Sequence, residues 1–148
     1  MSRIRFLAVL VLTALLAACA SGPRMAEIQS QIPRLDSSQG RIYIYRADSF
    51  VGAGVQPNVM LNGQIVGQSV PGGFFFVDVR PGPVEVSCST EVEKKLSLVM
   101  DAGQTRYVRT VVGLGFFVGR VYPELVDNTE GTKMVAEAKY IGTPLPKR

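Results

Sequence analysis

The chain has 148 residues, and 16 basic against 12 acidic side chains give a formal net charge of +4. This length fits one domain with a short additional segment. The sequence contains no histidine, which excludes Ser-His-Asp and Cys-His catalytic arrangements and imidazole metal sites. It also lacks a long run of Lys and Arg, so we do not expect a nucleic-acid partner.

The first 18 residues have the composition of a secretory leader. Arg3 and Arg5 supply a positive start, and an apolar stretch follows over residues 6–16. A membrane-spanning helix needs about 20 apolar residues, so this stretch is too short to span a bilayer. We therefore predict a signal peptide over residues 1–18 that is removed from the mature protein.

The leader ends in Leu16, Ala17, Ala18 and Cys19, a pattern that resembles the lipobox of bacterial lipoproteins. The resemblance implies that Cys19 carries acyl chains such as palmitate and becomes the first mature residue. Two or more chains anchor a protein stably, because each buried CH₂ contributes about 0.8 kcal/mol. Ala20 favours transfer to the outer membrane in a Gram-negative host, with the domain in the periplasm. The alternative is an ordinary secretory signal followed by a chance cysteine.

The rest of the chain divides into three parts. Residues 19–39 include Pro23 and Pro33 and few apolar side chains, so we predict a lipidated cysteine on a flexible tether. Residues 40–126 alternate apolar and polar side chains and predict the folded domain. Residues 127–148 predict a helix and a short tail.

The alternation from Gly40 onward predicts short strands separated by turns. Asn62-Gly63 is typical of a type I′ hairpin, which needs positive φ at both central residues. The expected strands cover residues 41–46, 59–61, 64–66, 74–79, 84–89, 96–100 and 105–112, with residues 111–118 as a further strand or a buried bend. Seven or eight short strands at this spacing predict an all-β, antiparallel β-sandwich.

The C-terminal part changes to a helical pattern. Asp127 and Glu130 have the spacing of a capping box, and apolar residues follow at helical intervals before Gly142 and Pro144. We predict one amphipathic helix over roughly residues 128–140 that lies against the sheet or on the membrane side of the domain.

Five segments of the domain carry a resemblance to known sequences: residues 40–46, 59–63, 71–75, 89–95 and 119–124. Through them the domain resembles a family of small bacterial lipoproteins whose domain has no assigned function. Residues 81–86 and 102–108 are similar to steps in transthyretin-like and PEGA-type sandwiches, which implies a prealbumin-like fold. A fold of this kind does not by itself identify a function.

Aromatic side chains alternate in two of the predicted strands. If the aliphatic residues between them face the core, then Tyr43, Tyr45, Phe74 and Phe76 face the other way. If the two strands are neighbours, these four rings share one outer face. That face is either covered by the C-terminal helix, which we favour, or available to a partner such as a peptide, a glycan or an outer-membrane protein.

The sequence offers two weak candidates for a reactive or metal-binding site: Cys88, and the pair Glu91 and Glu93. Cys88 shares strand parity with apolar neighbours and is expected to point inward as a small hydrophobe; the alternative is an intermolecular disulfide or a reactive thiol. Glu91 and Glu93 share one face and could bind calcium or act as acid and base, but a solvated edge is the simpler interpretation. We expect no cofactor and no metal.

These patterns favour a lipid-anchored cell-envelope protein with a non-catalytic binding or scaffolding domain. Membrane lipid, reached through Cys19, is the expected partner, and an envelope protein, peptide or glycan is a second. The alternative is a structural or stress-related envelope lipoprotein with no specific ligand. We do not expect an enzyme, because the sequence offers no catalytic set.

Overall fold

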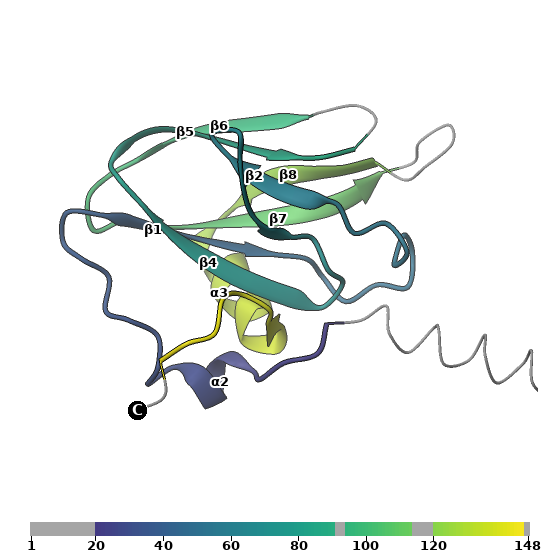
Figure 1. Cartoon of the computed structure of the whole chain (residues 1–148), viewed down its shortest axis with the longest axis horizontal. Helices are drawn as coiled ribbons and strands as arrows, with labels where there is room; N and C mark the ends of the chain where they lie inside the picture. Colours follow the sequence, from purple (N-terminus) through teal and green to yellow (C-terminus); the bar gives the residue numbers. More distant parts are fainter. Residues whose placement is uncertain (1–19, 91–93, 114–119, 147–148) are drawn as a thin grey trace, which may run out of the picture.

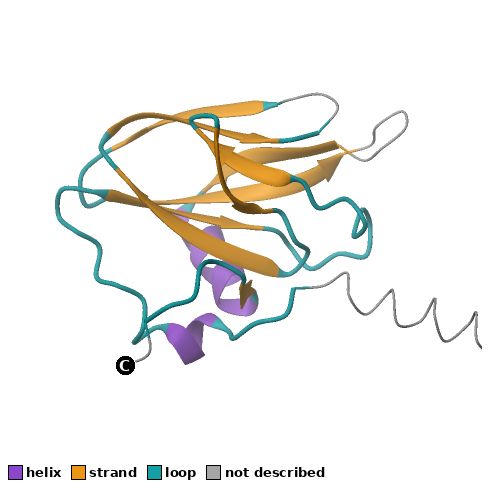
Figure 2. Ribbon diagram, viewed as in Figure 1, coloured by secondary structure: helices purple, strands orange, loops and turns teal. Residues whose placement is uncertain are grey.

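The computed structural model describes residues 20–90, 94–113 and 120–146. Within them two β-sheets stack on each other, and a helix lies against the outer face of the larger sheet (Figures 1 and 2). In spatial order the larger sheet contains β8 (Arg120–Val126), β7 (Thr105–Gly113), β1 (Gly40–Tyr45), β4 (Gly73–Val79) and β9 (Lys139–Tyr140). The smaller sheet contains β3 (Gln64–Gln68), β2 (Asn58–Leu61), β5 (Gly82–Cys88) and β6 (Lys95–Met100). The predicted β-sandwich with one C-terminal helix is confirmed.

The sequence predicted antiparallel strand pairing, but two of the strand pairs in the structure are parallel. β1 pairs in parallel with β7, and β4 pairs in parallel with β9, while the other pairs are antiparallel. Parallel neighbours need a long crossover connection. Between β1 and β7 the chain builds β4 and the whole smaller sheet, and this connection lets β7 return alongside β1 in the same direction.

The hairpin between β2 and β3 forms where the Asn-Gly pair predicts it. Asn62 has φ 49° and Gly63 has φ 78°, the two positive angles that a type I′ turn requires. The Asn62 side chain also accepts a hydrogen bond of 2.8 Å from the backbone N–H of Glu85 on β5. The turn therefore fixes the local strand pairing and holds the hairpin to its neighbour.

Strand β8 was missing from the sequence prediction. Pro123 lies in its middle and has no N–H to donate, so the segment does not look like a central strand. In the structure β8 is the edge of the larger sheet, where Pro123 pairs with Thr110. An edge position tolerates proline because one side of the strand needs no partner.

The inner core fills the space between the two sheets. Its side chains are mostly aliphatic and come from alternate positions of the strands, as the sequence pattern predicts. The buried members are Ile42, Ile44, Val59, Leu61, Phe75, Val84, Val86, Cys88, Met100, Val108 and Val121.

The C-terminal helix α3 (Asn128–Glu137) is shorter than predicted. Its N-terminus is capped as expected, because the Asp127 carboxylate accepts a 2.9 Å hydrogen bond from the Glu130 N–H. Ala138 is already extended, with ψ 167°. The chain then forms β9 alongside β4. Pairing with the sheet ends the helix before Gly142 and Pro144 are reached.

The segment predicted as a flexible tether is packed against the domain in its described part, which corrects that expectation. It begins at Ala20, which is 5% exposed, and contains the short helix α2 (Met25–Ile28), whose Ile28 is 3% exposed. Further on, the carbonyl of Pro33 accepts a 3.0 Å hydrogen bond from Arg41. The few apolar residues of this segment are enough because they complete a core that the rest of the chain supplies.

Candidate functional site

Strands β1 and β4 are neighbours, and their register brings the four predicted outward rings together. Tyr43 lies opposite Phe76, and Tyr45 lies opposite Phe74. The Tyr43 and Phe76 ring centroids are 5.7 Å apart. The predicted aromatic face therefore exists on the side of the larger sheet that faces away from the inner core.

This face is covered, as we favoured from the sequence. Tyr45 is 1% exposed and Phe74 is 0% exposed, so neither can contact a partner, whereas Tyr43 and Phe76 are half-buried. The covering elements are α2 and α3, while β9 extends the face at the edge of the sheet. Together with Tyr45 and Phe74, the buried residues Ile28, Val135, Ala138 and Tyr140 form a second cluster, called here the outer core.

Polar contacts at the rim hold α3 in place. The Tyr45 hydroxyl donates to Glu130 across 3.4 Å, and burial together with the nearby Glu130 carboxylate raises the pKa of Tyr45 to about 12. Arg109 donates to Glu130 on the helix at 2.8 Å and to Glu124 on β8 at 2.9 Å. These contacts connect the helix directly to β1 and β7 and, through Arg109, to β8.

Sequence reasoning missed two rings of this cluster, Tyr107 and Tyr140; the Tyr140 ring centroid lies 5.5 Å from that of Phe74. Tyr107 stacks on Tyr43 with ring centroids 5.3 Å apart. It reaches that position because β7 runs parallel beside β1, a pairing between strands far apart in sequence. Only the alternation within residues 105–112 could have indicated that Tyr107 faces outward.

Arg41 and Asp78 form an ion pair at the end of the aromatic face. Arg41 is 5% exposed, and two of its nitrogens donate to the two carboxylate oxygens of Asp78 at 2.6 and 2.7 Å. The guanidinium lies 4.4 Å from the Phe76 ring centroid. The hydrogen bond to Asp78 raises the pKa of Arg41. Because the same guanidinium also binds the carbonyl of Pro33, this pair attaches the N-terminal segment to the sheet.

The described chain enters the fold at one end of the sandwich. The Ala20 N–H donates a 2.9 Å hydrogen bond to the carbonyl of Pro71, and the Pro23 carbonyl accepts one of 2.8 Å from Tyr140. Gly22 lies so close to the Tyr140 carbonyl that an added Cβ would overlap it. The predicted lipobox residues Leu16, Ala17, Ala18 and Cys19 lie outside the described residues.

A buried arginine organises the loop next to this entry point. Arg46 follows β1 directly, is 3% exposed, and donates to the carbonyls of Gly52, Val55 and Ser69 at 2.7, 2.6 and 3.2 Å. Burial lowers its pKa. Backbone carbonyls replace the water that this charge loses on burial, so Arg46 fixes the path of residues 47–56. We call Ala20, this loop and the turn at residues 69–72 the entry end.

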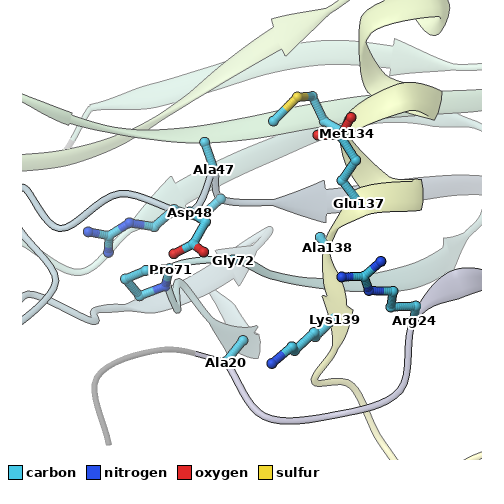
Figure 3. Close-up of a pocket in the computed structure, with 11 residues that line it drawn as sticks. Ala20, Arg24, Ala47, Asp48, Pro71, Gly72, Met134, Glu137, Ala138 and Lys139 are labelled. Carbon is cyan, nitrogen blue, oxygen red and sulfur yellow. The ribbon is translucent and has the colours of Figure 1, made fainter. Parts of the chain in front are cut away.

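A pocket of about 290 Å³ opens at the entry end (Figure 3). Five of its lining residues are charged, and they come from the N-terminal segment, the loop, α3 and β9: Arg24, Arg46, Asp48, Glu137 and Lys139. The mixture of charges suits a polar surface better than one ionic ligand. In the part of the chain that the structure describes, no three His, Cys, Asp or Glu side chains gather into a metal site.

The remaining sequence candidates carry little chemistry. Cys88 is 0% exposed and points into the inner core, and burial raises the pKa of its thiol to about 11. A buried neutral thiol is a poor nucleophile. Glu91 and Glu93 lie outside the described residues, so the structure does not test their interpretation as a carboxylate pair.

A known protein family matches residues 36–120, which is more than half of the chain. The matching family is described as "Protein of unknown function (DUF2846)". The chain belongs to the DUF2846 family. The match begins shortly before β1 and ends at the start of β8, so the outer core lies partly outside it. The family membership agrees with the resemblance to a domain without assigned function.

A relative of this DUF2846 protein is an uncharacterized protein of Haemophilus influenzae. The two are 29% identical over 129 residues, which cover 83% of this chain and 76% of the relative. No solved structure matches the chain, so the prealbumin-like assignment stays a prediction. None of the helices within the described residues combines the length and apolar character that a membrane span needs.

Proposed function

We propose that this DUF2846 protein is a lipid-anchored protein of the bacterial cell envelope, attached through Cys19, with a non-catalytic binding or scaffolding domain. The leader and the Leu16–Cys19 pattern carry the anchor, and residues 1–18 are removed during export. One structural observation supports it most: Ala20, the residue after Cys19, is buried and hydrogen-bonded to Pro71. The mature chain would then start at the surface of the folded domain.

With this arrangement, the anchor would keep the folded domain close to the membrane. A long flexible tether would let the domain move away from the bilayer, whereas attachment through Cys19, directly before the buried Ala20, would hold the sandwich beside it. Attachment to a surface raises the effective concentration of a domain toward other molecules on the same membrane. We propose a scaffolding or binding role at the outer membrane, with the domain in the periplasm; a position close to the bilayer supports the scaffolding or binding part of this proposal.

The anchor is tested by mass and by fractionation. Native protein should have the mass of residues 19–148 plus acyl chains, and Cys19→Ala should abolish acylation and membrane attachment. Cys88→Ala is the matched control, because it removes the other cysteine and should leave the protein acylated. A mature protein with a bare Cys19 thiol, or one that keeps residues 1–18, would overturn the proposal.

A structural or stress-related role without a specific ligand is the second candidate. The covered aromatic face supports it, because Tyr45 and Phe74 are used to hold the protein's own helix. A pull-down of acylated protein from detergent-solubilised membranes separates the two functions. One stoichiometric partner that is retained by Cys88→Ala supports the binding role, while no stoichiometric partner supports the structural role.

A further inference from the structure

The loop at residues 47–56 lies next to the point where the chain enters the fold. Gly72 donates a 3.1 Å backbone hydrogen bond to Arg46, the residue before the loop. A Cβ added to Gly72 would lie 3.4 Å from the Asp48 side chain. Ala20 and Asp48 line the same pocket (Figure 3). The loop and the start of the mature chain therefore occupy one end of the sandwich.

The tip of this loop exposes two large apolar side chains. Phe50 is 77% exposed and Val51 is 72% exposed. They are adjacent in sequence and two or three residues from Asp48. Arg46 holds the loop through the carbonyls of Gly52 and Val55, so the fold presents these side chains from a fixed base. Exposed apolar side chains on a supported loop are typical of an interaction surface.

Val99, another strongly exposed apolar residue, lies at the other end of the sandwich. Val99 is 64% exposed and belongs to β6, next to Met100, which contacts Gly40 at the start of β1. The loop at residues 47–56 follows the end of β1. Figure 1 shows these two ends of the sandwich on opposite sides of the molecule. Val99 therefore marks the end remote from Ala20.

We propose that Phe50 and Val51 insert into the lipid surface to which Cys19 is attached, so that the sandwich stands on the membrane with its entry end down. This inference rests on the proposed lipid anchor, which places a bilayer next to Ala20. Apolar side chains enter the boundary between headgroups and acyl chains, and cationic side chains favour anionic headgroups. Arg24 and Lys139 at the same pocket are such cations, but the exposed Asp48 and Glu137 beside them balance their charge, so the apolar side chains of the loop carry the proposal.

The chain contains no tryptophan, so a single introduced indole reports its own surroundings. Phe50→Trp places the reporter at the loop tip, and Val99→Trp is the matched control at the remote end. Acylated protein is purified from membranes, checked by intact mass and reconstituted into vesicles of phosphatidylethanolamine and phosphatidylglycerol. Fluorescence is then measured with and without lipids brominated on their acyl chains.

We expect Phe50→Trp to emit at shorter wavelength in vesicles and to be quenched by brominated lipid several-fold more than Val99→Trp. Equal and weak quenching of both variants on protein of confirmed acylation would overturn the loop insertion and leave the anchor intact. Strong quenching of both would also overturn it, because the sandwich would then have no fixed orientation.

Absence of acylation is a separate outcome that contradicts the proposed function. In that case the chain starting at Cys19 is coupled through that thiol to a maleimide phospholipid in the same vesicles. The buried Cys88 thiol, with its raised pKa, reacts poorly under these conditions. Preferential quenching of Phe50→Trp in the coupled protein supports loop insertion, and its absence overturns it.

Discussion

The larger sheet has an apolar layer on each face, and the two layers are built in different ways. The inner core consists mainly of aliphatic side chains from alternate strand positions. The outer core consists mainly of rings from β1, β4 and β9, closed by segments from the two ends of the chain. It also depends on close approaches: Gly131 of α3 lies directly on the Tyr107 ring. The inner core follows from local alternation, while the outer core requires long-range closure.

The largest expected effect is the loss of stability when a buried ring is truncated, and it tests whether both apolar layers stabilise the fold. Phe74 and Phe75 are adjacent, 0% and 3% exposed, and belong to opposite cores. Truncating a buried phenylalanine costs about 3–5 kcal/mol, so Phe74→Ala and Phe75→Ala should each lower the free energy of unfolding by that amount in denaturant titration. Ile65→Ala, at a side chain that is 65% exposed, is the control. A near-neutral Phe74→Ala would mean that the outer layer is only loosely attached.

A second prediction compares the two layers through pH. Burial raises the pKa of Cys88 in the inner core from 9.0 to about 11 and that of Tyr45 in the outer core from 10.0 to about 12. At a pH between these two pKa values, each side chain has lost its proton in the unfolded chain but keeps it in the folded protein. The free energy of unfolding should therefore fall as pH rises from 9 to 11 for Cys88 and from 10 to 12 for Tyr45, each by on the order of 2 kcal/mol.

Substitution separates the two titrations. Cys88→Ala should remove the part of the fall that begins near pH 9, and Tyr45→Phe the part that begins near pH 10. Unfolding curves collected at each pH give both slopes. An unchanged pH dependence in either variant would show that the corresponding side chain is not buried in its neutral form.

A third prediction concerns the close approach of helix and sheet. In Gly131→Ala the new Cβ would lie 2.2 Å from the Tyr107 Cγ, so α3 or the ring must move. Overpacking of this kind costs about 1–3 kcal/mol, even though alanine favours helix over glycine. Hydrogen exchange should show the loss of protection concentrated in α3 and β9. Lys133→Ala, on the exposed side of the same helix, should leave protection unchanged.

The smallest expected effect is at the ion pairs of the rim. Arg109 and Glu130 are both partly exposed, at 37% and 40% of their side chains, so Glu130→Gln should cost about 1 kcal/mol or less. The effect should shrink as salt is added, because solvent ions screen exposed charges. Glu85→Gln removes the comparable pair with Lys95 in the smaller sheet. A much larger cost for Glu130→Gln would show that α3 depends on this contact.

The sequence predicted the inner core and several turns because these features are local. Asn62-Gly63 determines its turn through backbone preferences alone, and alternation assigns Ile42 and Ile44 to one face. The same alternation predicted the aromatic face. It did not predict Tyr107, because the parallel pairing of β7 with β1 depends on residues far away. Strand β8 was not predicted because it contains Pro123, and a proline is compatible with a strand only at a sheet edge.

By itself the sequence determined the β-sandwich, the direction in which Cys88 and the four rings point, and the expected site of acylation. Only the tertiary structure decided how the two ends of the chain are used. At one end, residues 20–33 contain too few apolar side chains to form structure alone. At the other end, the two residues of β9 cannot form a stable strand alone. Both become ordered against a surface of rings that already exists, because burying those rings offsets the loss of chain entropy.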